Sequence, residues 1–159
     1  YHRVHGMDYV ALRYSNVYGP RQDPHGEAGV VAIFSTRLLE DRPLTVFGDG
    51  EQTRDYVFVG DVVTANLLLS DATFARSSGL DDRAFNVGTG IETSVNTLAG
   101  TLAAAADRPL RIDRAPARPG ELLHSSLDAS TLRRLGWNPA TDLPTGLRST
   151  IEWIAENSR

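Results

Sequence analysis

Apolar residues recur along this chain in two patterns: short runs bounded by turn residues, and longer stretches with apolar positions three or four residues apart. The short runs are typical of β-strands and the longer stretches of amphipathic helices. The predicted strands span residues 9–14, 44–47, 54–59 and 84–87, with a weaker candidate at 110–113. The predicted helices span residues 30–41, 61–69, 93–106, 128–135 and 144–154. This mixture indicates an α/β or α+β fold.

Polar residues, glycine and proline set the boundaries between these elements. Asp61, Thr93 and Asp128 are predicted N-caps, because their side-chain oxygens can accept hydrogen bonds from the first amides of a helix. Gly136 is predicted to end the fourth helix. The predicted loops, which are rich in Gly, Pro and polar residues, are 16–26, 76–82 and 114–121.

The first predicted strand, residues 9–14, is mostly apolar or aromatic and is therefore expected to be buried. A buried strand normally has neighbours on both sides. Residues 1–5 resemble the end of a helix rather than the start of a domain. We therefore expect the chain to be the latter part of a larger protein.

The composition is that of one globular domain, with 159 residues of which 41% are apolar and 23% charged. No apolar run approaches the roughly 20 residues that a bilayer helix needs, and the first residues lack the pattern of a secretory signal. A net charge of −4 disfavours a general nucleic-acid binder. Cysteine is absent, which excludes disulfides and fits a reducing compartment, so we expect a soluble, cytoplasmic protein.

All sixteen basic residues are arginines, so the chain contains no lysine. This excludes Schiff-base catalysis, a Walker lysine and a Tyr-x-x-x-Lys proton relay within the chain. No Gly-x-Ser-x-Gly motif indicates a hydrolase. His2 and His5 could share a helix face, but no third ligand lies nearby in the sequence, so no metal site is expected.

Gly88 and Gly90 follow a predicted strand and precede a predicted helix, which is the setting of a dinucleotide-binding Gly-x-Gly-x-x-Gly motif. Thr93 stands where the third glycine would be, so the motif is incomplete. A tight turn into a capped helix explains both glycines, and this is our prediction for the segment.

Arg54 and Arg118 lie in distant segments, one at the start of a strand and the other in a proline-rich loop. A guanidinium can hold phosphate oxygens through two parallel hydrogen bonds, so two arginines can grip a diphosphate from both sides. Glu121 can then accept from ribose hydroxyls. From spacing alone, surface or ion-paired arginines are the alternative. Asn16 likewise offers an amide to a ligand at a strand end, or completes the turn that follows it.

Four motifs stand in order along the chain. They are Arg13-Tyr14-x-Asn16-Val17-Tyr18-Gly19-Pro20-Arg21-Gln22, Phe47-Gly48-Asp49-Gly50-x-Gln52-x-Arg54-Asp55-Tyr56-x-x-Val59-x-Asp61-Val62, Phe85-Asn86-Val87-Gly88-Thr89-Gly90 and Arg118-Pro119-Gly120-Glu121. In this combination the chain resembles the C-terminal portion of extended short-chain dehydrogenase/reductases that act on nucleotide sugars, most closely UDP-glucose 4-epimerases. The resemblance covers essentially all 159 residues.

The resemblance implies an α/β fold, made of the last parallel strands of a Rossmann-type domain and a smaller mixed α/β substrate-binding lobe. It implies a homodimeric, NAD-dependent isomerase of carbohydrate metabolism that interconverts UDP-glucose and UDP-galactose through a 4-keto intermediate. An N-terminal half, absent from this chain, would carry the NAD-binding loop and the catalytic Tyr-x-x-x-Lys pair. No catalytic residue is therefore assigned here, and the chain alone is expected to be inactive.

The resemblance also implies roles for individual residues. Tyr14, Ser15 and Val17 would border the NAD cofactor. Asn16, Arg54 and Arg118 would bind the substrate diphosphate, with Tyr56 packed nearby and Glu121 at the ribose. Gly29 and Val30 would approach the sugar or the phosphates, and Thr45, Val46 and Phe47 would line the uracil, partly through backbone groups.

Two positions depart from the pattern of some related epimerases. Ala28 stands in place of an amide side chain, and Ser125 lies near the position of an aromatic one. Sugar contacts by those groups are therefore not expected. The alternatives are a sugar-nucleotide 4,6-dehydratase or decarboxylase of the same superfamily, and a non-catalytic nucleotide-sugar binding module. Residues 26–31 resemble epimerases more than the Lys-containing stretch of dehydratases.

Overall fold

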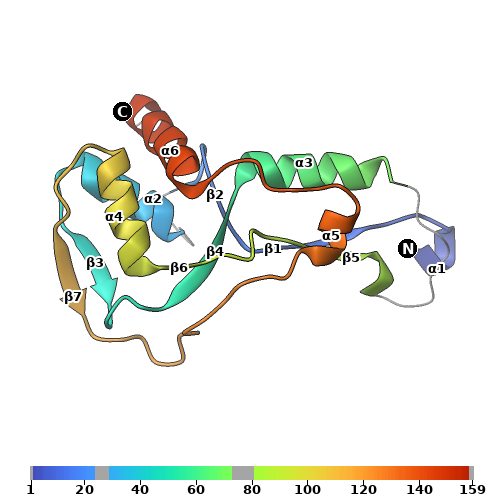
Figure 1. Ribbon diagram of the computed structural model, residues 1–159, viewed down its shortest axis with the longest axis horizontal. Helices are drawn as coiled ribbons and strands as arrows, with labels where there is room; N and C mark the ends of the chain where they lie inside the picture. Colours follow the sequence, from blue (N-terminus) through green and yellow to red (C-terminus); the bar gives the residue numbers. More distant parts are fainter. Residues whose placement is uncertain (1, 24–28, 73–80, 158–159) are drawn as a thin grey trace.

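The computed structural model describes residues 2–23, 29–72 and 81–157, in which helices and strands alternate along the chain (Figure 1). The strands are β1 (Ala11–Tyr14), β2 (Asn16–Tyr18), β3 (Leu44–Phe47), β4 (Thr53–Phe58), β5 (Ala84–Val87), β6 (Glu92–Ser94) and β7 (Ile112–Ala115). The helices are α1 (His2–His5), α2 (Val30–Leu39), α3 (Val59–Ser70), α4 (Val95–Ala105), α5 (Ser130–Arg134) and α6 (Leu143–Asn157), with a short 3₁₀ turn at Asp81–Arg83. Among the described residues, no helix is long and apolar enough to cross a membrane.

The strands pair in three small sheets. β1 pairs with β5 and β3 pairs with β7, in both cases in parallel. β4 lies between β2, which is parallel to it, and β6, which is antiparallel. In Figure 1, β4 runs from the end of the molecule that holds β3, β7 and α4 toward the end that holds α3, α5 and β5. These mixed elements with parallel pairs confirm the α/β class predicted from the sequence.

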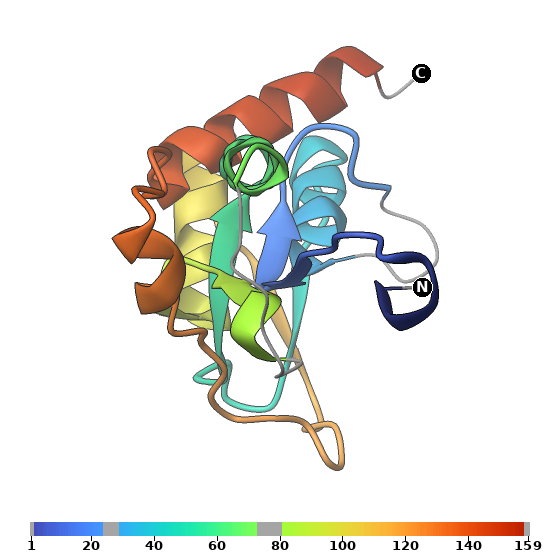
Figure 2. The same ribbon diagram turned by 90° about the vertical axis from the view of Figure 1, so that its right-hand side faces the viewer.

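β4 contributes to both hydrophobic cores of the molecule, because successive side chains of a strand point to opposite faces. Tyr56 belongs to a core formed with α2, α4 and α6, and Val57 to a core formed with α3, β5 and α5. Leu98, Leu102 and Leu147 are completely buried in the first core. There α2, α4 and α6 pack on one another, and Figure 2 shows α6 crossing above the other two. Packing on both faces therefore fixes the position of β4.

The helix N-caps predicted at Asp61, Thr93 and Asp128 are wrong. The observed N-caps are Phe58 for α3, Ser94 for α4 and Ala129 for α5. Ser94 caps with its side chain, which accepts a hydrogen bond from the amide of Thr97 at 3.1 Å. Thr93 belongs to β6, a strand too short to appear in the hydrophobic pattern.

Asp61 and Asp128 bind other backbone amides. Asp61 lies inside the first turn of α3 and accepts from the amides of Ala140 and Thr141, at 2.9 and 3.1 Å. It thereby ties the start of α3 to the segment that precedes α6. Asp128 accepts from the amide of Ser130 at 2.8 Å, from one position before the N-cap of α5. A polar residue near a helix start is thus satisfied by tertiary or turn contacts in both cases.

The strands also differ from the prediction at their ends. β1 is shorter and more exposed than expected, with Tyr14 45% exposed, because β5 is its one paired neighbour among the described residues. β2 occupies residues predicted as turn, since pairing with β4 keeps the backbone extended up to Tyr18. β7 starts later than predicted and includes residues 114 and 115 of a predicted loop. Residues 24–26 and 76–80 of the other predicted loops lie outside the described residues.

Gly146 of α6 lies so close to its neighbours that a side chain would clash. A Cβ atom there would be 2.9 Å from Cζ of Tyr18 and 3.0 Å from the Phe58 ring. We expect Gly146→Ala to lower the free energy of unfolding by about 1–3 kcal/mol, because overpacking a tight core outweighs the better helix propensity of alanine. Gly100→Ala in α4, where nothing lies within 4 Å of the new Cβ, is the matched control and should stabilise by about 0.5–1 kcal/mol. Urea denaturation measures both changes, and a stabilising Gly146→Ala would contradict the expectation.

Candidate functional site

A cleft of about 500 Å³ lies among the start of α2, the strands β3 and β4, and the loop after β7. It brings together most of the residues that the sequence motifs singled out for substrate binding. They are Asn16, Gly29, Val30, Thr45, Phe47, Arg54, Tyr56, Arg118 and Glu121. These side chains come from segments more than 100 residues apart, so the fold alone makes them neighbours.

The N-terminus of α2 opens into this cleft, since Gly29 and Val30 line it. The N-cap is Gly29, which has no side chain to cap the helix. The amide of Ile33 bonds back to the Gly29 carbonyl at 3.3 Å. The partial positive charge of a helix N-terminus favours a negatively charged ligand at this end of the cleft.

Arg54 projects from β4 and is held by the loop that closes one side of the cleft. Its Nη1 donates to the carbonyls of Thr53 and Leu122, at 2.7 and 2.8 Å. Its Nη2 lies 3.5 Å from Oε1 of Glu121, and the two side chains are 21% and 26% exposed. The ion-paired alternative considered from spacing is therefore correct for Arg54, yet the same guanidinium also lines the cleft.

Arg118 stands over an aromatic ring on the opposite wall. Its Cζ lies 3.9 Å from the ring centroid of Phe47, which is a cation–π contact. The parallel pairing of β3 with β7 places Phe47 opposite Ala115, so the loop that carries Arg118 starts beside that ring. Within the described part of the chain, Arg118 forms no ion pair, and its charge is available to a ligand.

Tyr56 lies at the base of the cleft and carries a buried hydroxyl without a hydrogen-bond partner among the described residues. Burial raises its pKa to about 12, although the positive charge of Arg54 lowers it. The phenol therefore stays protonated at neutral pH. A buried hydroxyl without a partner costs about 1–3 kcal/mol, so this group favours a ligand that completes its hydrogen bonding.

Replacing Tyr56 with phenylalanine tests this point. We expect Tyr56→Phe to leave the free energy of unfolding unchanged or slightly higher, because it removes an unsatisfied polar atom. We expect it to weaken binding of UDP, the nucleotide that the sequence resemblance implies, by roughly five- to tenfold. Tyr14→Phe is the matched control, since the Tyr14 hydroxyl donates to Oδ1 of Asn66 at 3.1 Å away from the cleft. Isothermal titration calorimetry with UDP checks both variants. Unchanged affinity in Tyr56→Phe would show that the hydroxyl does not meet the ligand.

β3 presents alternate residues to the cleft. Thr45 and Phe47 line it, whereas the side chain of Val46 is completely buried in the hydrophobic core. A contact of Val46 with a nucleobase is therefore restricted to its backbone. The predicted roles of these residues at a uracil ring stay predictions.

The residues expected to border NAD lie outside the cleft. Ser15 sits between β1 and β2, where its amide donates to the carbonyl of Val87 at 3.0 Å. Val17 packs against the core that contains Val57, and Tyr14 bonds to Asn66. Their neighbour Asn16 faces the cleft instead, because β2 pairs Asn16 with Tyr56 and alternates its side chains. Ala28 lies outside the described residues.

Other cleft residues were not singled out from the sequence. They are Ile33, Phe34, Arg37, Gln52 and Val95. Ile33 and Arg37 follow Val30 at helical spacing, so the face of α2 that carries Val30 predicts them once that face is assigned. Gln52, whose Nε2 donates to the Phe47 carbonyl at 3.0 Å, and Val95 come from distant segments, and no spacing signal connects them to the site.

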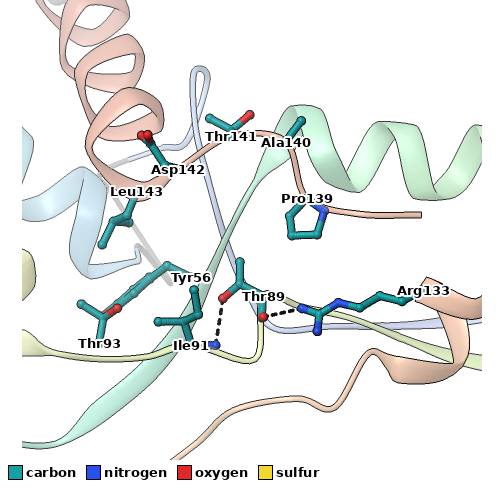
Figure 3. Close-up of a pocket in the computed structure, with 10 residues that line it drawn as sticks. All are labelled: Tyr56, Thr89, Ile91, Thr93, Arg133, Pro139, Ala140, Thr141, Asp142 and Leu143. Carbon is teal, nitrogen blue, oxygen red and sulfur yellow. Dashed lines mark hydrogen bonds between the residues drawn. The ribbon is translucent and has the colours of Figure 1, made fainter. Parts of the chain in front are cut away.

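A second hollow of about 340 Å³ also borders Tyr56 and is shown in Figure 3. The 139–143 segment forms one wall and Thr89, Ile91 and Arg133 form the other. Arg133 donates to the Thr89 carbonyl at 2.6 Å. This hollow is lined by one arginine, whereas the first cleft is lined by Arg37, Arg54 and Arg118, so the first cleft is the better site for an anion. Among the described residues, no three His, Asp or Glu side chains are grouped to hold a metal ion.

The fold and the cleft define an α/β protein in which two arginines and the start of a helix meet at one cleft beside parallel strands. The profile of the NAD dependent epimerase/dehydratase family matches residues 1–88, and the chain belongs to this family. It is 45% identical, over its whole length, to a UDP-glucose 4-epimerase of Mycolicibacterium smegmatis, of which it covers 49%. It is 35% identical over 99% of its length to a dTDP-glucose 4,6-dehydratase of Actinoplanes sp., of which it covers 47%.

Solved structures of epimerases are also similar to this chain. The UDP-glucose 4-epimerase of Thermotoga maritima with UDP-glucose superposes with a TM-score of 0.89 at 43% identity, over 99% of this chain and 49% of that one. The UDP-glucose 4-epimerase of Thermus thermophilus in complex with NAD superposes with a TM-score of 0.85 at 40% identity, over 99% and 50%. The chain therefore spans about half the length of the relatives that it matches. The resemblance indicated by the four sequence motifs is confirmed.

Proposed function

We propose that this chain is the C-terminal, substrate-binding portion of a nucleotide-sugar 4-epimerase that interconverts UDP-glucose and UDP-galactose. The observation that carries the proposal is the convergence of Arg54, Arg118 and the N-terminus of α2 on one cleft. Three positively polarised groups suit a diphosphate. Phe47 offers a ring on which a uracil can stack, and Glu121 offers an acceptor for ribose hydroxyls.

The cleft fits the binding requirements of such a reaction. An epimerase must hold the diphosphate firmly while the sugar turns between its two faces. Arg54 and Arg118 would bind the diphosphate tightly. Gly29 and Val30 have small side chains, so few side-chain contacts would restrain a sugar that lies beyond the diphosphate.

NAD, when bound, would supply hydride transfer at the sugar C4. The residues that we expect to border it are Tyr14, Ser15 and Val17. Ser15 fits a bound group, because its hydroxyl is buried and has no hydrogen-bond partner among the described residues. We place the main NAD site and the catalytic Tyr-x-x-x-Lys pair in an N-terminal portion of the protein, so this chain alone is expected to be inactive. The complete enzyme is expected to be a cytoplasmic homodimer.

A sugar-nucleotide 4,6-dehydratase is the second candidate. The similarity to the Actinoplanes dTDP-glucose 4,6-dehydratase favours it, since both classes have relatives across the whole chain. Both activities would use the diphosphate site described above. They differ in the chemistry at the sugar, which the residues of this cleft do not perform.

The test is to incubate the full-length protein with UDP-galactose and follow the sugar by NMR, with the 159-residue chain assayed alongside. We expect the full-length protein alone to produce UDP-glucose. Dehydration of dTDP-glucose without epimerisation of UDP-galactose would favour the second candidate. Turnover by the 159-residue chain would contradict the assignment of catalysis to the other portion.

A further inference from the structure

The turn formed by Gly88, Thr89 and Gly90 encloses the carboxylate of Asp55, which is 1% exposed. Oδ1 of Asp55 accepts from the amide and the hydroxyl of Thr89, at 2.9 and 2.6 Å. Oδ2 accepts from the amides of Gly90 and Leu127, at 3.0 and 3.3 Å. Four donors from two separate segments therefore converge on one buried side chain.

The glycines of this turn are explained by that carboxylate. A Cβ atom at Gly88 would lie 3.3 Å from Cγ of Asp55 and 3.2 Å from Cβ of Leu127, and closer still to Oδ2. Gly90 has a φ of 74°, a conformation that other residues rarely adopt. Successive backbone amides in such a turn form a cradle for an anion. The anion here is a side chain of the protein and not a dinucleotide phosphate.

Asp55 stands between two residues of the cleft. Arg54 and Tyr56 line the cleft, and Asp55 points to the opposite face of β4, because side chains alternate along a strand. Asp55 also contacts Leu127, which lies in the same segment, residues 118–127, as Arg118 and Glu121. The amide of Thr53 donates to the carbonyl of Leu123 at 2.7 Å, and Arg54 donates to the carbonyl of Leu122, so β4 and this segment are joined at several places.

The charge of Asp55 is met by backbone and hydroxyl donors. Asp55 forms no ion pair with Arg54 within the described part of the chain, although the two are adjacent in sequence. The charge of Arg54 therefore remains directed at the cleft, where Glu121 is its partner.

We propose that Asp55 is a positioning residue for diphosphate binding: it fixes β4 to the 88–90 turn and to the segment after Arg118, so that Arg54 and Arg118 are held across the same cleft. This inference rests on the proposed function, since it names the residue that orients the two arginines. Asp55 itself does not touch the substrate.

The test compares Asp55→Asn with Asp61→Asn. Both aspartates are almost completely buried and accept backbone amides, but Asp61 joins α3 to residues 140 and 141, away from the cleft. Both variants place an NH₂ group against amide donors, so both should lower the melting temperature. By isothermal titration calorimetry on the full-length protein, we expect Asp55→Asn to weaken UDP binding by roughly tenfold and Asp61→Asn to leave it within about twofold.

The outcomes distinguish a failure of the role proposed for Asp55 from a failure of the proposed function. An equal affinity in Asp55→Asn and the wild type would overturn the inference, and so would an equal loss in both variants, because that would reflect stability alone. A wild-type full-length protein that does not bind UDP would contradict the proposed function instead.

If Asp55→Asn fails to fold, Thr89→Val carries the test, because it removes one donor to the carboxylate and keeps the backbone amides. Its control is Thr64→Val, which removes a hydroxyl that accepts from the Trp137 indole at 3.1 Å near Asp61. We expect Thr89→Val to weaken UDP binding by about three- to fivefold and Thr64→Val to leave it unchanged. Equal affinities in Thr89→Val and the wild type would overturn the inference.

Discussion

Replacing Arg118 with alanine should weaken UDP binding by about 10- to 100-fold and leave the free energy of unfolding nearly unchanged. The Arg118 guanidinium lies on the Phe47 ring and forms no ion pair within the described part of the chain, so its charge is available to the proposed diphosphate. Charge-assisted hydrogen bonds to phosphate are each worth about 1.5–3 kcal/mol. Arg54→Ala should cause a loss at least as large, because Arg54 also holds the loop through the Leu122 carbonyl.

Isothermal titration calorimetry on the full-length protein measures these changes. Arg148→Ala is the matched control, since Arg148 is exposed on α6 and lies outside the cleft. Arg118→Lys keeps the charge but loses the planar fork, so we expect an intermediate affinity. Wild-type affinity in Arg118→Ala would contradict the diphosphate site. It would favour a purely structural role for this segment.

Replacing Leu147 with alanine should lower the free energy of unfolding by about 2–5 kcal/mol. Leu147 is completely buried in the core where α2, α4 and α6 pack together. Truncation leaves a cavity that rigid helices cannot fill, so both the transfer free energy and the packing contacts are lost. The same core supports α2, whose N-terminus opens into the cleft, so UDP affinity should fall when the variant is partly unfolded.

Urea denaturation followed by circular dichroism measures this effect. Leu67→Ala on α3 is the matched control, because Leu67 is also helical but is 61% exposed in this chain, and its truncation should change stability by less than about 0.5 kcal/mol. Equal midpoints for the two variants would show that the three-helix core is not the main source of stability.

Hydrophobic periodicity predicted most of the longer elements. The strands at 44–47 and 84–87 were predicted with the bounds that the structure has, and α2, α3, α4 and α6 lie where apolar residues recur at helical spacing. β2 and β6 were missed because each has three residues, too few to show a period. The caps were wrong for a different reason. Asp61 hydrogen-bonds to a segment far along the chain, and no local pattern reveals such a partner.

The sequence predicts those residues of the cleft that belong to a recognisable motif. Arg54 and Arg118 are separated by 64 positions in the sequence, so only the resemblance to a family predicts that they share one site. Arg37 was missed because it lies outside every motif, on a helix whose other face is core. Gln52 stands within a motif, but its contact with the Phe47 carbonyl depends on a turn that the sequence does not specify.

Four consecutive residues of β4 alternate between two faces of the strand. Arg54 and Tyr56 face the cleft, whereas Asp55 faces the 88–90 turn and Val57 faces the core formed with α3, β5 and α5. A shift of one position would exchange the two faces along the whole strand. A substitution in β4 therefore affects one face, whereas an added or removed residue would disturb both faces of the strand. We expect homologous chains to differ in length in their surface loops and to keep the spacing from Arg54 to Val57 constant.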